Sequence, residues 1–216
     1  MNRSIFLLAI LTVVHLGITA QEIPLPTEYS VVDTVSGDLD KDGIKELVVA
    51  YNTDKTSEDS EGVIRDLIIY KKEKDKWISW KQSLQALLGS RDGGMMGDPY
   101  EMMEIKNGIL MISHAGGSSW KWGHTDKYRF QNDEFYLIGF SNNYGKPCEY
   151  WEDVDFNLST GWLVIKKEYE DCDKGQEIYK TENESFLKKG LIITLQNRHD
   201  KKVKLVSPKY KHEIYL

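Results

Sequence analysis

The sequence predicts an all-β protein, built as an antiparallel meander in a curved-sheet or propeller-like arrangement with little helix. Short runs rich in Val, Ile, Tyr, Trp and Phe are separated by clusters of Asn, Asp, Gly and Lys at the spacing of β-hairpins. Helix signals are weak, because only residues 83–90, "SLQALLGS", combine a capping residue, an apolar repeat and a closing glycine. The sequence supports a short helix there and the absence of a helix equally well.

The turn chemistry supports this prediction. Asn107-Gly108 is the strongest hairpin signal, because both central positions of a type I′ turn require positive φ. Residues 72–76, "KEKDK", and 131–134, "QNDE", are expected to join two further strand pairs. The expected strands cover residues 46–51, 65–72, 76–80, 108–114, 126–131, 134–140 and 190–196.

The first residues of the chain have the pattern of a signal peptide. In residues 1–20, Arg3 precedes an apolar run that is short for a bilayer span, and the chain turns polar directly after Ala20. We expect cleavage after Ala20, no transmembrane segment afterwards, and one β-rich domain over residues 21–216. The expected location is the periplasm or the extracellular space.

Charge bounds the class of partner. The full chain has a formal net charge of −6, and loss of residues 1–20 removes Arg3 and no acidic residue, which makes it −7. This mild acidic excess argues against nucleic acid as a partner. A protein or a glycan is the expected ligand.

Residues 36–51, "SGDLDKDGIKELVVAY", are the clearest candidate metal site. The carboxylates of Asp38, Asp40 and Asp42, the carbonyl of Ile44 and the carboxylate of Glu46 recur at alternate positions, and Gly43 permits a sharp turn. Oxygen ligands in this pattern suit Ca²⁺ better than Mg²⁺. A solvated acidic turn without metal is the alternative, although four converging acids would repel one another.

The acidic stretch is not an EF-hand. That motif needs a bidentate acid at position 12 and a following helix, whereas position 12 counted from Asp38 is Val49, inside a β-branched run. The segment "DLDKDGIKEL" instead resembles one copy of the FG-GAP and VCBS repeat family. The resemblance implies a turn that joins two strands and binds structural calcium through the residues named above.

The two cysteines are expected to pair, as is common in exported proteins. Cys148 and Cys172 flank a hairpin whose turn, "LSTG", places Gly161 at a left-handed position, and the expected register sets the two cysteines opposite each other. Two free thiols, or a register shifted by one residue, are the alternatives.

Residues 89–130 hold an unusual cluster of glycines, aromatics and acids. Arg91, Asp98, Trp120, Trp122 and His124 are its candidate ligand-binding residues, because glycines permit close approach and exposed aromatic rings can stack on a sugar. The alternative is that the aromatics chiefly pack strands together. Residues 36 to about 141 also resemble small exported bacterial proteins with a "GG-S-x-W" pattern, a resemblance that implies no activity.

Each catalytic interpretation of this cluster lacks a residue or motif that the chemistry requires. "GGSSW" has no nucleophile elbow, His114 and His124 have no third zinc ligand, and Asp92 with Asp98 is an unspecific carboxylate pair. The leading hypothesis is a calcium-stabilised, exported binding or envelope-associated module that is not an enzyme. The rivals are a carbohydrate-binding protein or carbohydrate-active hydrolase that uses residues 89–130, and a structural protein that meets its partner at a strand edge.

Overall fold

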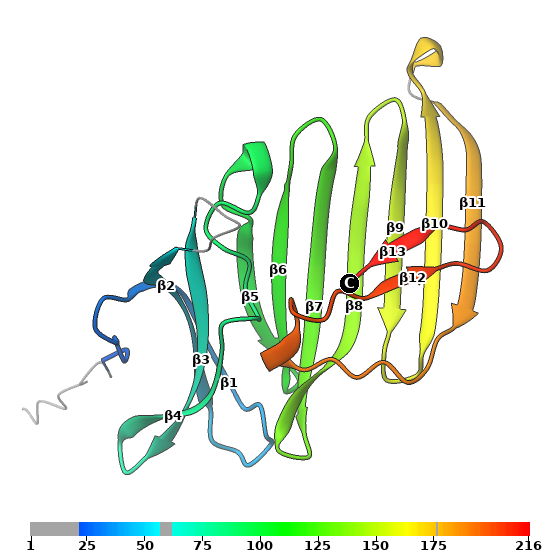
Figure 1. Ribbon diagram of the computed structural model, residues 1–216. Helices are drawn as coiled ribbons and strands as arrows, with labels where there is room; N and C mark the ends of the chain where they lie inside the picture. Colours follow the sequence, from blue (N-terminus) through cyan, green and yellow to red (C-terminus); the bar gives the residue numbers. More distant parts are fainter. Residues whose placement is uncertain (1–21, 57–61, 176) are drawn as a thin grey trace, which may run out of the picture.

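A computed structural model describes residues 22–56, 62–175 and 177–216, and within them the protein is all-β, as predicted (Figure 1). The expected signal peptide lies outside the described residues. The first sheet has four strands in the order in which they occur, β1 (Ser30–Gly37), β2 (Glu46–Thr56), β3 (Val63–Glu73) and β4 (Lys76–Ser83).

The second sheet has seven strands, again in chain order and antiparallel. Its strands are β5 (Tyr100–Lys106), β6 (Ile109–Gly117), β7 (Lys121–Gln131), β8 (Glu134–Lys146), β9 (Tyr150–Asn157), β10 (Trp162–Asp171) and β11 (Glu177–Leu187). A ribbon of β12 (Lys204–Val206) and β13 (Glu213–Tyr215) follows, and short 3-10 turns are η1 (Gly94–Met96), η2 (Cys172–Lys174) and η3 (Leu195–Asn197). The chain therefore forms two successive antiparallel meanders, in the curved-sheet arrangement that the sequence predicts.

The predicted turns have the backbone that their residues favour. Asn107 and Gly108 both have positive φ, 55° and 74°, between β5 and β6. Both turn residues also have positive φ at two other tight hairpins, Lys74-Asp75 between β3 and β4 and Asn132-Asp133 between β7 and β8. Such turns match the right-handed twist of the strands they join.

One predicted strand is wrong, and the helix that the sequence left open at residues 83–90 does not form. Residues 83–90 form no helix, because Ala86 and Leu87 are buried in the core while the backbone bends around them. Residues 190–196 form no strand of either sheet, since residues 190–193 have no regular structure and η3 begins at Leu195. Ile193 and Leu195 point into the core, and the segment pairs through a single bridge, Tyr136 with Thr194. The apolar alternation reports burial there, not a hydrogen-bonded ladder.

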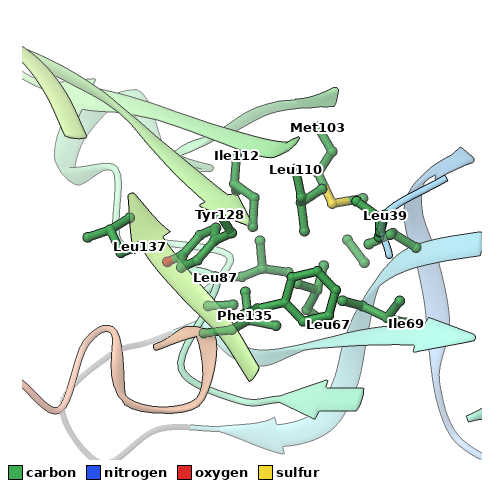
Figure 2. Close-up of a cluster of buried hydrophobic side chains, with 14 of the residues drawn as sticks. Leu39, Leu67, Ile69, Leu87, Met103, Leu110, Ile112, Tyr128, Phe135 and Leu137 are labelled. Carbon is green, nitrogen blue, oxygen red and sulfur yellow. The ribbon is translucent and has the colours of Figure 1, made fainter. Parts of the chain in front are cut away.

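The main core lies between the two sheets. Figure 2 shows Leu39, Leu67 and Ile69 of the first sheet and its loop meeting Leu110 and Tyr128 of the second. All five are 1% exposed or less. Burial of side chains of this size contributes about 1.5–3 kcal/mol each relative to exposure, so this contact holds the sheets together.

The C-terminal segment covers one face of the seven-stranded sheet, here called the inner face. Figure 1 shows the β12–β13 ribbon crossing strands β8 to β11, and Leu205 and Ile214 of the ribbon pack with Phe156 and Ile165. In β9 the buried residues alternate with exposed ones, which gives the outer face a polar surface.

A buried ion pair fixes the same segment. Arg198 donates from Nε to Asp126 Oδ2 at 2.7 Å and from Nη2 to Oδ1 at 3.1 Å, and both side chains are at most 3% exposed. Bidentate geometry of this kind offsets the cost of removing both charges from water.

Candidate functional site

The acidic loop joins β1 to β2 and brings three carboxylates together. One oxygen from each of Asp38, Asp40 and Asp42 lies within 4.8 Å of the others. The aspartates also accept from the loop backbone, since Asp38 bonds the N–H of Gly43 at 3.1 Å and Asp42 that of Ile44 at 2.7 Å. The spacing therefore places the oxygens on one side of a compact turn.

Two further features of this loop agree with the sequence pattern. Gly43 has a φ of 88°, the left-handed conformation that glycine adopts without strain. Glu46 is 1% exposed at the start of β2, and its Oε2 accepts from Leu39 N at 2.7 Å. Burial raises the pKa of Glu46 above its ordinary value, and the nearby Asp40 and Asp42 act in the same direction.

The negative charge of the loop is only partly offset by the described residues, so a cation could bind there. Asp38 Oδ1 is buried and has no hydrogen-bond partner among the described residues. Lys71 forms an ion pair with Asp40, and its ammonium is also attracted by the carboxylates of Glu46 and Asp42. These attractions raise the pKa of Lys71 although its partial burial acts in the opposite direction. A single lysine partly offsets several negative groups, and a divalent ion bound by carboxylates would offset more of that charge.

The predicted disulfide is present. Cys148 and Cys172 are bonded, with their Cα atoms 5.0 Å apart. The expected register, however, is wrong by one residue. Asn157 pairs with Trp162, so the ladder extended to Cys148 would oppose it to Asp171. The cysteines meet because both leave the ladder, Cys148 with a φ of 68° and Cys172 in η2.

The predicted ligand-binding residues of the glycine and aromatic cluster do not converge on one cleft. Asp98 accepts from both terminal nitrogens of Arg65, whose side chain is 1% exposed, with Nη1 2.8 Å from Oδ1. That contact lowers the pKa of Asp98 although partial burial opposes it. Arg91 is exposed in the turn before η1.

Trp120 and Trp122 are half-buried and stack on neighbouring rings. Trp120 lies parallel to Tyr144, with a centroid distance of 5.3 Å and an interplanar angle of 10°. Trp122 stacks on His124 at 5.8 Å and 15°. These contacts follow the register, which sets Trp122 opposite Tyr144 on the inner face. Both tryptophans therefore have structural contacts of their own.

The glycines of this region are explained by close packing. A Cβ on Gly116 would lie 2.5 Å from Trp122 Cζ2 and 2.8 Å from the backbone of Gly93. The N–H of Gly117 donates to Gly93 O at 2.8 Å and ties the η1 loop to β6. Here glycine permits two backbones to approach each other.

Buried histidines lie close to Trp122. His114 is 1% exposed, and its ring centroid is 5.2 Å from that of His124. Burial lowers the pKa of His114 to about 2 and that of His199 to about 4, and it lowers the pKa of His124 as well. His199 comes from the C-terminal segment, so its proximity was not visible in the sequence.

Each face of the seven-stranded sheet has a sizeable cleft. The outer one, about 690 Å³, is a shallow trough over small and polar residues of neighbouring strands, among them Ser113, Ala115, Gly123, Thr125, Ser141 and Asp155. The inner one, about 520 Å³, lies between the sheet and the β12–β13 ribbon, where Asn142, Tyr144, Tyr150, Glu152, His212 and Tyr215 line it. Sequence reasoning did not single out these inner residues, which carry no motif.

Within the described residues no helix has the length and apolar character of a membrane span. Comparisons of the chain with protein-family models and with curated proteins give no match.

Proposed function

We propose that the protein is an exported β-sheet module that is stabilised by calcium and binds a partner without catalysing a reaction. The observation that carries the proposal is the convergence of Asp38, Asp40 and Asp42, with an unpartnered oxygen on Asp38. The resemblance of this turn to one FG-GAP or VCBS copy agrees with it. A disulfide is compatible with an oxidising compartment.

The proposed role of calcium is to fix the β1–β2 hairpin. Leu39 in the same loop is 1% exposed and belongs to the main core, so ordering the loop also orders part of the contact between the sheets. The alternative of a carbohydrate-active protein that uses residues 89–130 has less support, because Asp98 is paired with Arg65 and the tryptophans stack on Tyr144 and His124.

The test is thermal unfolding of the purified protein in calcium and in chelator. A ligand that binds only the folded state adds about 2.7 kcal/mol at a hundredfold excess over its dissociation constant, which corresponds to a midpoint shift of about 5–10 °C for a domain of this size. Asp40→Asn is expected to remove the shift. Asp75→Asn, in the exposed turn between β3 and β4, is the matched control and should retain it.

Two results would refute the metal proposal. One is a midpoint that does not change over millimolar calcium. The other is a shift that persists in Asp40→Asn, since the ion would then bind elsewhere. Magnesium in place of calcium should give a smaller shift, because it prefers few protein ligands and a rigid octahedral shell.

A further inference from the structure

The inner cleft has the size and composition of a small-ligand site. Its volume of about 520 Å³ is within the range of ligand pockets, and its walls combine tyrosine rings and aliphatic side chains with a few polar groups. The sheet supplies one wall through β8, β9 and β10, and the β12–β13 ribbon with the residues before it supplies the other. The C-terminal segment thus completes the cleft.

Two glutamates and two lysines line the cleft, and three of these four side chains are already in ion pairs, whereas Lys211 donates to Pro208 O at 2.8 Å. Glu152 is 7% exposed, and its Oε2 lies 3.2 Å from His212 Nδ1 and 3.4 Å from Lys167 Nζ. Across the cleft, Glu213 pairs with Lys204 at 2.7 Å. A charged ligand would have to break one of these pairs, which is costly in a partly buried site, or depend on the exposed Lys211 alone as its counter-charge. The lining therefore favours a neutral ligand.

Several polar groups of the cleft remain available. Among the residues that the structure describes, the Asn142 amide and the Tyr144 and Tyr150 hydroxyls have no hydrogen-bond partner. Within the described residues Glu152 Oε1 has no hydrogen bond or ion pair, since both partners of this carboxylate use Oε2. A wholly apolar ligand would leave these groups unsatisfied, which costs free energy. A ligand with several hydroxyl groups would satisfy them.

The aromatic walls are held in place for contact with carbon–hydrogen faces. Trp120 stacks behind Tyr144, and Lys167 Nζ lies 3.5 Å from the centroid of the Tyr150 ring. Tyr215 is 59% exposed at the rim of the cleft. Amphipathic rings of this kind suit a ligand that has both apolar faces and a polar edge.

We propose that this inner cleft binds a neutral saccharide of one or two rings, with Asn142, Tyr144, Tyr150 and Glu152 as hydrogen-bond partners and Tyr215 as a platform at the entrance. The inference rests on the proposed binding function and names its ligand class. It places the site between the C-terminal ribbon and β8–β10, away from the calcium loop.

The experiment is isothermal titration of the full protein with cellobiose, maltose, lactose and N,N′-diacetylchitobiose, with 3′-sialyllactose as the charged comparison. We expect at least one neutral disaccharide to bind with a dissociation constant below about 1 mM. Asn142→Ala and Tyr150→Phe should each weaken that binding about tenfold with little change in the unfolding midpoint. Asn143→Ala, on the outer face of the same strand, is the matched control and should bind normally.

The proposal is overturned if no neutral disaccharide binds at 10-fold above that concentration, if sialyllactose binds more tightly than every neutral sugar, or if Asn143→Ala weakens binding as much as Asn142→Ala. Repeating the titration in chelator separates the two proposals. Sugar binding without any calcium shift would refute the metal proposal alone, and a calcium shift without sugar binding would refute the cleft proposal alone.

Discussion

Replacing Arg198 with methionine is expected to destabilise the protein strongly. The substitution leaves Asp126, 0% exposed, without its cationic partner and removes two hydrogen bonds of 2.7 and 3.1 Å. Loss of one partner of a buried pair costs about 3–5 kcal/mol. For a domain of this size that is a fall in the unfolding midpoint of about 6–20 °C.

A double variant separates the uncompensated charge from the lost packing. Because Arg198→Met with Asp126→Asn removes both charges, we expect it to be more stable than Arg198→Met alone, with a coupling of at least about 1 kcal/mol. Equilibrium unfolding in urea measures the free energy of each variant. Lys204→Met is the surface control, because the Lys204–Glu213 pair is exposed and its loss should change stability by at most about 1 kcal/mol.

The reasoning is refuted by either of two results. Arg198→Met could unfold within 1 kcal/mol of the parent, the size of a surface effect. Alternatively, the losses of stability in Arg198→Met and in Asp126→Asn could add up to that of the double variant without coupling. That result would show that Arg198 contributes by packing against Phe140, whose ring centroid is 5.5 Å from the guanidinium carbon.

Further predictions concern the disulfide, the histidines and the glycine loop. Cys172→Ser should lose about 3.5 kcal/mol on the chain-entropy estimate for a separation of 24 residues, and reductant should lower the stability of the parent but not of this variant. The pKa values of His114 and His199, about 2 and about 4, lie below the unfolded value near 6.5, so unfolding takes up protons in acid. The contribution of these histidines to the free energy of unfolding should be fully present above pH 6.5. Between pH 6.5 and 4 it should fall by about 1.4 kcal/mol per pH unit for each histidine. A urea midpoint that does not change from pH 7 to 5 would contradict this. Gly116→Ala should cost about 1–3 kcal/mol, because its Cβ would overlap a tryptophan ring and a backbone, and an unchanged melting midpoint would show that the η1 loop moves freely aside.

Much of the fold could be predicted because it depends on local chemistry. Positive φ at Asn107 and Gly108 follows from the two residue types, and strand alternation follows from the need to bury one face. The acidic loop is equally local, since alternate aspartates around Gly43 need only a tight turn to bring their oxygens together.

Other predictions failed or lay beyond the sequence because long-range packing decides them. Ile193 and Leu195 alternate like a strand, yet they fill the core from a segment whose backbone pairs only once. The register of Cys148 was wrong by one residue although Gly161 has the expected positive φ, and the observed ladder pairs the buried Phe156 with Leu163 and Val154 with Ile165.

The sequence alone determined the all-β class, the hairpin turns, the pairing of the cysteines and the local shape of the acidic loop. Only the tertiary structure decided that His199 lies with the buried histidines, that Arg198 pairs with Asp126, and that the last residues close a cleft over Asn142. The physical reason is the separation along the chain between the residues that interact. A turn is governed by a few adjacent dihedral angles, whereas contacts across more than seventy residues depend on which face of the curved sheet the C-terminal segment covers.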